Sequence, residues 1–306
     1  MKILSILFCL GFLTSVQAES LDFDQKKVVF DFLDFVNGVK DKDCPEIEIK
    51  SYKAKGNDHF SSNEKAKLSK SEFDKLDKLS QSVLTMKTDP KDAKRDSHGN
   101  EIILFGSAFH IGSNLVLTNV HVLDGTFKNL TNCGTFKLRD ARTKQQMYCK
   151  KVHYCQADID VCLIEMKEIK NIPSLKLKAN PIITEADKKT KELTVIGNPL
   201  GQGLKISRGK GITPSGVNYL LNTPVTIGNS GGPLLDNEGN VLGIVRRQGK
   251  LDEDGNPTKK VNDKYVKEPA YLSSIATNSK AMIEAIRKGL AGDPETLKKF
   301  NEAVVE

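Results

Sequence analysis

The sequence from Ser82 onward predicts an all-β protein built as two barrel halves. Short runs of β-branched and aliphatic residues are separated by Gly, Asn and Asp, which is typical of antiparallel strands joined by turns. A polar stretch with a proline, residues 176–191, interrupts these runs and is the expected connection between the halves. The expected strands are, in order, SVLTMK, IILFGSAFHI, NLVLTN, CGTFKLR, MYCKKVHY, DVCLIEM, ELTVIG, GVNYLLN, GPLLD and NVLGIVRR.

Residues 279–290, after the last strand, predict an amphipathic helix. Met282, Ile283 and Ile286 recur at helical spacing and should face inward. The tail over residues 293–306 is too short for another domain. We therefore expect one folded domain over residues 79–292, which suits a chain of 306 residues with an extension at its start.

The first eighteen residues, 1–18, predict a cleavable secretory signal. Lys2 is followed by an apolar stretch and by the small-residue end Val16-Gln17-Ala18. The apolar stretch is shorter than the ~20 residues that a membrane-spanning helix needs. We therefore expect an exported protein, periplasmic or extracellular, without stable membrane insertion.

Residues 19–78 form an extension that is rich in Lys, Asp and Ser. It contains two short helical patterns, of which the first is VVFDFLDFV. The second begins with Ser69 and Glu72 as a capping box and places Phe73, Leu76 and Leu79 on one face. The extension could be a propeptide, a docking arm or a cap, and the sequence does not choose among these roles.

Composition argues against nucleic acid as a partner. The formal net charge is +7, and it becomes +6 when Lys2 leaves with the signal. A nucleic-acid binder is expected to gather its lysines on one face and to interleave aromatic residues. Here Lys, Asp and Glu alternate throughout, which indicates an ordinary solvated surface.

Five of the six cysteines remain after signal cleavage, and an exported protein can pair them as disulfides. Cys133 and Cys149 flank an expected hairpin tip, and Cys155 and Cys162 are the next candidate pair. Cys162 could instead be a buried thiol, and at least one cysteine stays unpaired or bridges to another chain. With neither a Cys-x-x-Cys nor a His-x3-His element in the sequence, we expect no metal site and no cofactor.

The strongest chemical signal is Gly228-Asn229-Ser230-Gly231-Gly232-Pro233, which leads directly into an expected strand. A nucleophilic serine needs a tight turn with small neighbours and converging backbone amides. Ser230 is the candidate nucleophile, and the amides of Gly228 and Ser230 would form the oxyanion hole. An ordinary Gly-rich turn is the alternative interpretation of this motif.

His121 ends the apolar run LVLTNVH and is the candidate base. A serine hydroxyl is a poor nucleophile at neutral pH, so a histidine with a reference pKa of ~6.5 has to accept its proton. His59, His98, His110 and His153 lack this context, and we expect structural roles for them. The carboxylate that orients the base would be Asp160, which opens the strand VCLIEM, with Asp158 as the rival.

The order His, Asp, Ser with these flanking residues resembles the trypsin-like serine peptidases of chymotrypsin fold. Thr-Asn-x-His, Ile196-Gly197-Asn198-Pro199-Leu200-Gly201 and Gly-Asn-Ser-Gly-Gly-Pro are most similar to the bacterial HtrA-like branch. The resemblance covers roughly residues 80 to 290. It implies two six-stranded antiparallel β-barrels and the triad His121, Asp160 and Ser230.

In strands of this family the acid is followed by apolar residues at the first, third, fourth and sixth places. Counting from Asp160 gives Val161, Leu163, Ile164 and Met166, whereas counting from Asp158 fits more loosely. The resemblance also implies an S1 pocket with one wall over residues 223–227, including Val225, Thr226 and Ile227. Arg246, Arg247 and Gln248 would border the cleft on the other side.

Two departures from the family pattern bear on regulation. The resemblance implies a PDZ domain in most HtrA-like proteins, and we expect none here. Asn229 stands where digestive trypsins have Asp before the serine, so activation by an N-terminal ion pair is not expected.

The resemblance also bears on the preferred P1 residue of the substrate. No Asp lies at the position that gives trypsin its preference for Lys or Arg, so a basic P1 residue is not expected. A small aliphatic P1 residue is expected first, and an acidic one second if Arg247 points inward.

The expected function is therefore hydrolysis of protein or peptide substrates by an exported serine endopeptidase. A catalytically silent homologue acting as a binding or chaperone-like protein is the alternative. An α/β-hydrolase esterase is excluded, because that fold places its histidine last in the chain. The oligomeric state does not follow from the sequence.

Overall fold

The computed structural model describes residues 53–54, 57–59, 69–88, 94–95, 101–102, 104–124, 131–201, 203–221, 223, 225, 228–248, 258–261, 264–267 and 274–306. The chain divides into two compact units. The smaller unit spans residues 1–47, 88–103 and 250–270 and contains the strand pairs β4 (Lys94–Arg95) with β5 (Glu101–Ile102) and β18 (Thr258–Val261) with β19 (Lys264–Lys267). The larger unit holds every element of the site below. The expected signal over residues 1–18 and the first helical pattern lie outside the described residues.

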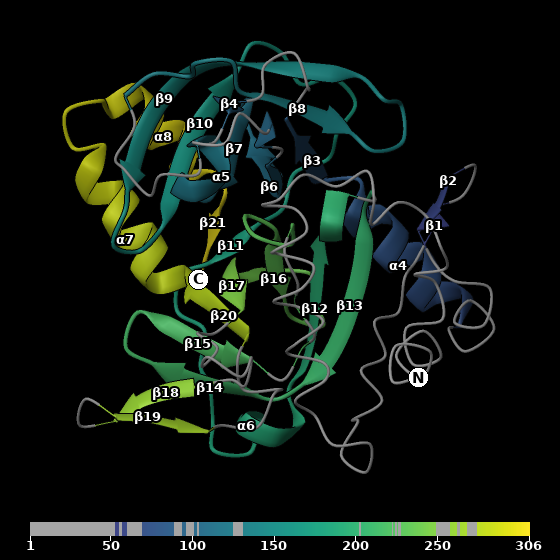
Figure 1. Ribbon diagram of the computed structural model, residues 1–306, viewed down its shortest axis with the longest axis vertical. Coiled ribbons are helices and arrows are strands. Elements are labelled where there is room, and N and C mark those ends of the chain that lie inside the picture. Colours follow the sequence, from purple (N-terminus) through teal and green to yellow (C-terminus); the bar gives the residue numbers. More distant parts are fainter. Residues whose placement is uncertain are drawn as a thin grey trace. The chain divides into compact units, whose positions relative to one another are not determined.

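The first half of the larger unit is a closed barrel of six strands (Figure 1). Every neighbouring pair in it is antiparallel, as short strands joined by turns allow. The strands run around the barrel in the order β10 (Val161–Met166), β7 (Leu115–Thr118), β6 (Phe105–Gly112), β3 (Val83–Lys87), β8 (Lys137–Asp140) and β9 (Gln146–Gln156).

The second half is a curled sheet. Its path runs through β13 (Lys205–Lys210), β12 (Glu192–Gly197), β16 (Pro233–Leu235), β17 (Val241–Gln248), β20 (Ser274–Asn278), β15 (Asn218–Leu221) and β14 (Ile212–Ser215). The two ends of this path, β13 and β14, are separated in sequence by Gly211 alone, whose φ is +99°. The chain bends there, so β13 and β14 act as two halves of one strand, and the sheet curls round upon itself. The predicted chymotrypsin-type, mainly β architecture is thereby confirmed.

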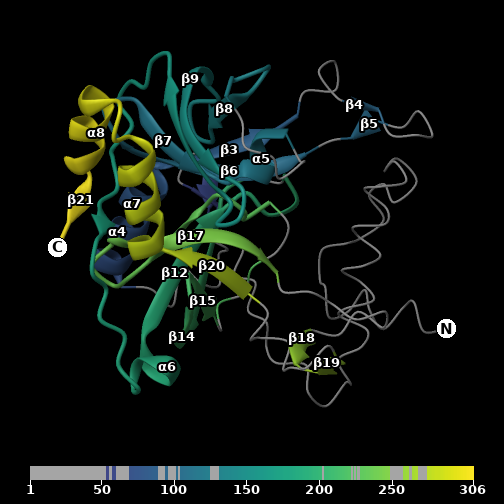
Figure 2. The same cartoon turned by 90° about the vertical axis from the view of Figure 1, so that its left-hand side faces the viewer.

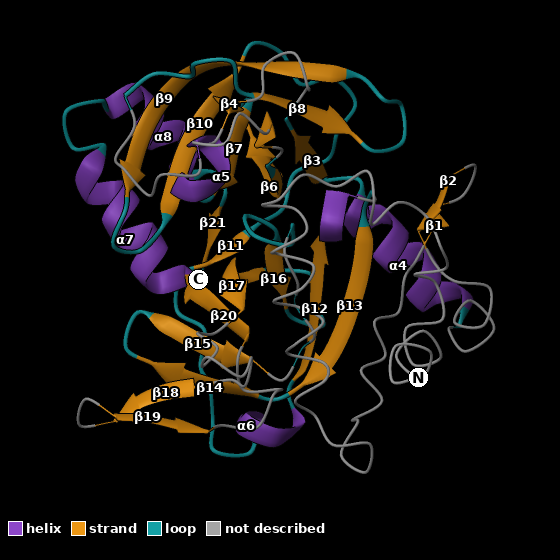
Figure 3. Ribbon diagram, in the orientation of Figure 1, coloured by secondary structure: helices purple, strands orange, loops and turns teal. Residues whose placement is uncertain are grey.

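The longer helices, drawn in purple in Figure 3, pack their buried faces against these strands. α7 (Ser279–Gly289) was predicted, and its inward residues Met282, Ile283 and Ile286 are all buried. α4 (Lys70–Ser80) begins at Ser69, whose side chain and that of Glu72 form the predicted capping box. α8 (Pro294–Asn301) begins after the cap Asp293 and leads to the strand β21 (Val304–Val305).

Residues outside the expected domain also belong to its core. Leu76 of α4 and Phe300 of α8 pack in the same buried cluster as strand residues such as Phe109 and Ile244. β21 pairs in parallel with β11 (Leu177–Lys178), which also pairs with β17. Figure 2 shows α7, α8 and β21 along one side of the larger unit. The remaining short elements are β1 (Lys53–Ala54), β2 (Asn57–His59), α5 (Val120–Asp124), α6 (Asp187–Thr190) and η2 (Pro199–Gly201).

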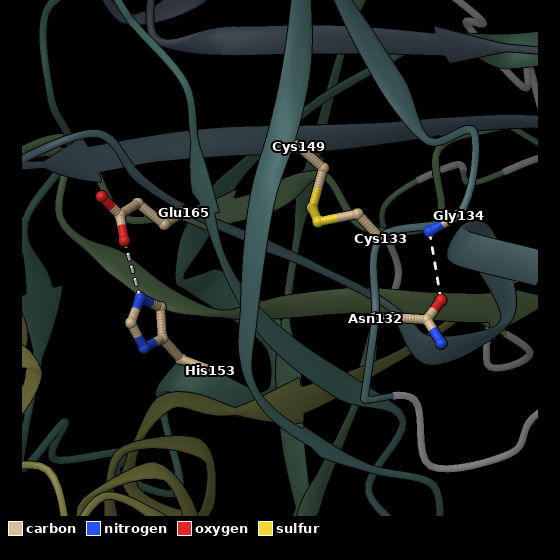
Figure 4. The surroundings of a disulfide bond; sticks show 6 residues. All are labelled: Asn132, Cys133, Gly134, Cys149, His153 and Glu165. Carbon is tan, nitrogen blue, oxygen red and sulfur yellow. Dashed lines mark hydrogen bonds and ion pairs between the residues drawn. A yellow bond between two sulfur atoms is a disulfide. The ribbon is translucent and has the colours of Figure 1, made fainter.

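Both candidate disulfides are present. Cys133 and Cys149 are bonded with their Cα atoms 5.6 Å apart, at the base of the β8–β9 hairpin (Figure 4). Cys155 and Cys162 are also bonded, and they face each other directly in the register of β9 and β10. Cys162 is therefore not a buried free thiol, and Cys44 lies outside the described residues. Within the described part of the chain, no helix is long and apolar enough to cross a membrane.

Candidate active site

His121 and Asp160 lie together at one end of the first barrel. His121 sits in α5 directly after β7, and Asp160 directly precedes β10, the partner strand of β7. The Nδ1 atom of His121 is 2.8 Å from Oδ2 of Asp160, and the backbone N–H of His121 donates to Oδ1 at 3.2 Å. When Nδ1 carries the proton of the neutral ring, Nε2 is the unprotonated nitrogen, which is the tautomer that a general base requires.

Asp160 is the candidate acid that the structure brings to the histidine. Its side chain is 0% exposed, whereas that of Asp158 is exposed and accepts from the backbone N–H of Ile159 at 2.9 Å. A hydrogen bond from Asn119 and the backbone conformation of Asp160 itself account for its position. Asn119, from the Thr-Asn-x-His motif, donates its side-chain amide to the Asp160 carbonyl at 2.6 Å. The backbone of Asp160 has φ +55°, a conformation that aspartate adopts more readily than most residues.

The turn before β16 presents Ser230 between two glycines in left-handed conformations. Gly228 has φ +94° and Gly231 has φ +82°, which residues with a Cβ rarely adopt. A Cβ at Gly231 would also lie 2.1 Å from the carbonyl oxygen of Ser107. Backbone geometry therefore requires glycine at 228 and 231, and the close approach of the first barrel also requires it at 231.

Ser107 on β6 joins this turn to the first barrel, and sequence reasoning missed it. Its hydroxyl donates to the Gly228 carbonyl at 2.7 Å and accepts from the Asn198 backbone at 2.9 Å, and its own N–H donates to the Ser230 carbonyl at 2.8 Å. Ser107 is fully buried. A serine in the middle of a buried apolar strand was the signal that could have identified it, because buried hydroxyls need partners.

Ser230 itself is buried to 8% exposure, and its hydroxyl donates to the carbonyl of Arg246 on β17 at 3.0 Å. The guanidinium of Arg246 extends from the same residue toward the first barrel. Its Nη2 donates to the carbonyl of Asp158 at 2.8 Å, and its Nε lies 3.6 Å from Oδ2 of Asp160. Arg246 thus contacts the turn that carries the candidate acid as well as the candidate nucleophile.

The expected S1 residues are less completely placed. Val225 is 8% exposed and belongs to a buried hydrophobic cluster of the curled sheet, with Val195, Leu234 and Val245. Thr226, Ile227 and the Arg247 side chain lie outside the described residues. The expected pocket wall stays a prediction.

The other described histidine side chains lie in structural settings. His110 is buried, and its Nδ1 contacts the carbonyls of Ile172 and Pro173 at 3.0 Å each. Burial lowers the pKa of His110. His153 contacts Glu165 at 3.0 Å from Nε2 (Figure 4) and Thr296 at 3.2 Å from Nδ1. Among the residues that the structure describes, no three His, Cys, Asp or Glu side chains are arranged to hold a metal.

Comparison with known proteins identifies the domain. Residues 106–244 match the family model of the trypsin-like peptidase domain, and this range contains His121, Asp160 and Ser230. No curated protein sequence matches the chain.

Solved structures with a similar fold are proteases at low sequence identity. The serine endoprotease from Yersinia pestis is 15% identical with a TM-score of 0.48, over 69% of this chain and 64% of its own. The HtrA-type protease AlgW with a tripeptide is 17% identical with a TM-score of 0.49, over 70% and 61%. A variant of AlgW with a tripeptide is 16% identical with a TM-score of 0.51, over 72% and 63%.

This chain covers less than two thirds of each of these three structures. The likeness to the AlgW variant agrees with the barrel and curled sheet described above. Residues 106–244 therefore match a trypsin-like peptidase domain, and the larger unit has a fold of the chymotrypsin type.

Proposed function

We propose that this protein is an exported endopeptidase that hydrolyses protein substrates through an acyl-enzyme on Ser230, with His121 as base and Asp160 as its carboxylate partner. One observation carries the proposal, namely the 2.8 Å contact between Nδ1 of His121 and a carboxylate oxygen of a fully buried aspartate. A buried carboxylate that receives Nδ1–H fixes the tautomer and stabilises the imidazolium that forms when Nε2 takes a proton.

The chemistry begins when Nε2 of His121 takes the proton of the Ser230 hydroxyl. Oγ then attacks the scissile carbonyl carbon, and the backbone N–H groups of Gly228 and Ser230 bind the resulting oxyanion. Each such donor contributes about 3–4 kcal/mol to transition-state stabilisation. His121 returns the proton to the leaving amine, and water then releases the acyl group by the same steps in reverse.

The nucleophile has to change its hydrogen bond before this sequence can begin. Its hydroxyl donates to the Arg246 carbonyl in this structure. A hydroxyl has one proton, so Ser230 has to release the Arg246 carbonyl before it can donate that proton to His121.

Substitution of the three residues tests the proposal. We expect Ser230→Ala and His121→Ala each to lower kcat on a casein-like substrate by about 10⁶-fold. Asp160→Asn should lower it by about 10⁴-fold, because an amide favours the wrong tautomer of His121. Parent-like activity in Ser230→Ala protein would overturn the assignment.

Asp158→Asn is the matched control for Asp160→Asn. Asp158 is two residues away, exposed, and uses its side chain only to accept from the Ile159 backbone in the contacts described above, which an Asn oxygen can also do. We expect its activity to match the parent. Equal losses in the two variants would show that the choice of Asp160 is wrong.

Labelling with a fluorophosphonate probe separates an enzyme from a silent homologue, because the probe reacts only with an activated serine. Labelling that is abolished by Ser230→Ala is the expected result. Suppression of protein aggregation without any labelling would instead support the binding or chaperone-like alternative.

A further inference from the structure

Arg246 contacts the candidate triad at two places that lie in different halves of the fold. Through its backbone carbonyl, on β17 of the curled sheet, it accepts from the Ser230 hydroxyl at 3.0 Å. Through its guanidinium it contacts the turn before β10 of the first barrel, donating to the Asp158 carbonyl at 2.8 Å and approaching Oδ2 of Asp160 to 3.6 Å. The same Oδ2 atom is the partner of His121.

Low solvent exposure strengthens the electrostatic interaction between the Arg246 guanidinium and the Asp160 carboxylate. The Arg246 side chain is 18% exposed and that of Asp160 is 0% exposed. Charges so far removed from water interact more strongly than surface charges, because little solvent lies between them. An arginine keeps its charge at every pH at which a peptidase works. Asp160 therefore faces a permanent cation on one side and His121 on the other.

We propose that Arg246 is a positioning residue of the peptidase site, acting through Asp160: it fixes the 158–160 turn and shares the carboxylate oxygen that holds His121. The inference rests on the proposed function, since it assigns Asp160 to the triad. Arg246 does not act as base or nucleophile, and its side chain needs no contact with substrate.

Two consequences follow for catalysis. The bond to the Asp158 carbonyl anchors a turn in which Asp160 holds φ +55°, so its loss should let the carboxylate drift from His121. In addition, loss of the guanidinium removes the cation that lies 3.6 Å from Oδ2 of the buried Asp160, the same oxygen that holds His121. The charged groups of these contacts are Asp160 from the turn before β10, which holds His121, and Arg246 from β17, which approaches Asp160. The side chain of Asp158 is exposed.

Removing the charge should move the acid limb of the kcat/KM profile to higher pH. For Arg246→Gln in the full chain we expect this shift because the Asp160 carboxylate that holds His121 then lacks its cationic neighbour. The plateau of kcat should fall on the order of tenfold as the turn loosens, with KM changed by less than about twofold. The measurement is a pH series of kcat and KM on a peptide that the parent cleaves and the Ser230→Ala variant does not.

Arg246→Lys separates charge from geometry and keeps the inference testable if the Gln variant does not fold. Lysine retains the cation but lacks the planar fork that reaches both the carbonyl and the carboxylate. The acid limb should stay near that of the parent while kcat falls. An acid limb that moves as far in Arg246→Lys as in Arg246→Gln would overturn the inference.

Arg139→Gln is the matched control, because it removes the same charge from an exposed position on β8. Its pH profile should coincide with that of the parent. Parent-like profiles in both Arg246 variants, or an effect confined to KM, would refute the positioning role while leaving the peptidase proposal intact. Absence of cleavage and probe labelling in the parent protein would refute the peptidase proposal itself.

Discussion

Ser107 binds the nucleophile turn through its backbone and its hydroxyl at once. It donates to the carbonyls of Gly228 and Ser230, and it accepts from the backbone of Asn198, all within 2.9 Å. The residues that surround Ser230 therefore do not depend on the turn alone for their conformation. They are also held by β6 of the first barrel, which carries Ser107. The neighbouring strand β7 leads to His121.

Ser107→Ala should reduce catalysis more than it reduces substrate binding. The substitution removes the hydroxyl that bridges the Asn198 N–H and the Gly228 carbonyl and leaves these groups only their own 3.3 Å hydrogen bond. Poorly satisfied buried polar groups cost about 1–3 kcal/mol. We expect kcat to fall by about 10- to 100-fold, with a smaller change in KM, and the melting temperature to fall. Steady-state kinetics and thermal unfolding measure the two effects. Ser174→Ala, at an exposed serine, is the control, and an equal loss of kcat in both variants would contradict the role of Ser107.

At the level of elements, the local sequence pattern predicted those strands, turns and helices whose formation depends on residues close together in the sequence. The apolar run before His121, the small residues around Ser230 and the helical spacing over 279–290 all indicated the elements that the structure contains. Local pattern left the rivalry between Asp158 and Asp160 open and missed Ser107, because both depend on distant partners. Asp158 and Asp160 both precede alternating apolar residues, and only the three-dimensional register of β7 and β10 brings one of them to His121. Ser107 looked like a strand residue because its partners are more than ninety residues away in sequence.

The disulfide between Cys155 and Cys162 belongs to the same element as Asp160. It joins β9 to β10 on either side of the turn that contains Asp158 and Asp160. A crosslink restricts the unfolded chain, and here it also restricts the ends of a turn with a strained backbone. The second disulfide, Cys133–Cys149, joins the segment before β8 to β9 and does not enclose the turn of Asp160.

Removing each disulfide in turn should separate stability from catalysis. We expect both double variants, Cys155→Ala with Cys162→Ala and Cys133→Ala with Cys149→Ala, to lose roughly 2–4 kcal/mol of unfolding free energy. Only the first should also lower kcat/KM, because only that crosslink bounds the turn of Asp160. Denaturant unfolding and kinetics at a temperature where all variants are folded make the comparison. Equal kinetic losses in the two double variants would show that the Cys155–Cys162 bond has no special relation to the site.

On the scale of the whole larger unit, the proposed triad depends on how the two halves pack. His121 and Asp160 come from the first barrel, and Ser230 comes from the curled sheet. One buried cluster joins these halves. It combines side chains of the first barrel, such as Leu117, with those of the curled sheet, such as Ile244, and with helical residues of α4, α7 and α8. The C-terminal segment thus contributes to the packing that sets the spacing of the site.

Phe300→Ala should destabilise both halves together. Phe300 of α8 is 0% exposed within that shared cluster, and truncating a buried phenylalanine costs about 3–5 kcal/mol through lost burial and a residual cavity. We expect one unfolding transition at lower temperature in calorimetry, and loss of fluorophosphonate labelling that coincides with it. Lys298→Ala, at an exposed position of the same helix, should leave the transition within about 0.5 kcal/mol of the parent. If Phe300→Ala protein unfolded in two separate steps and kept its labelling through the first, the shared core would not be what holds the site together.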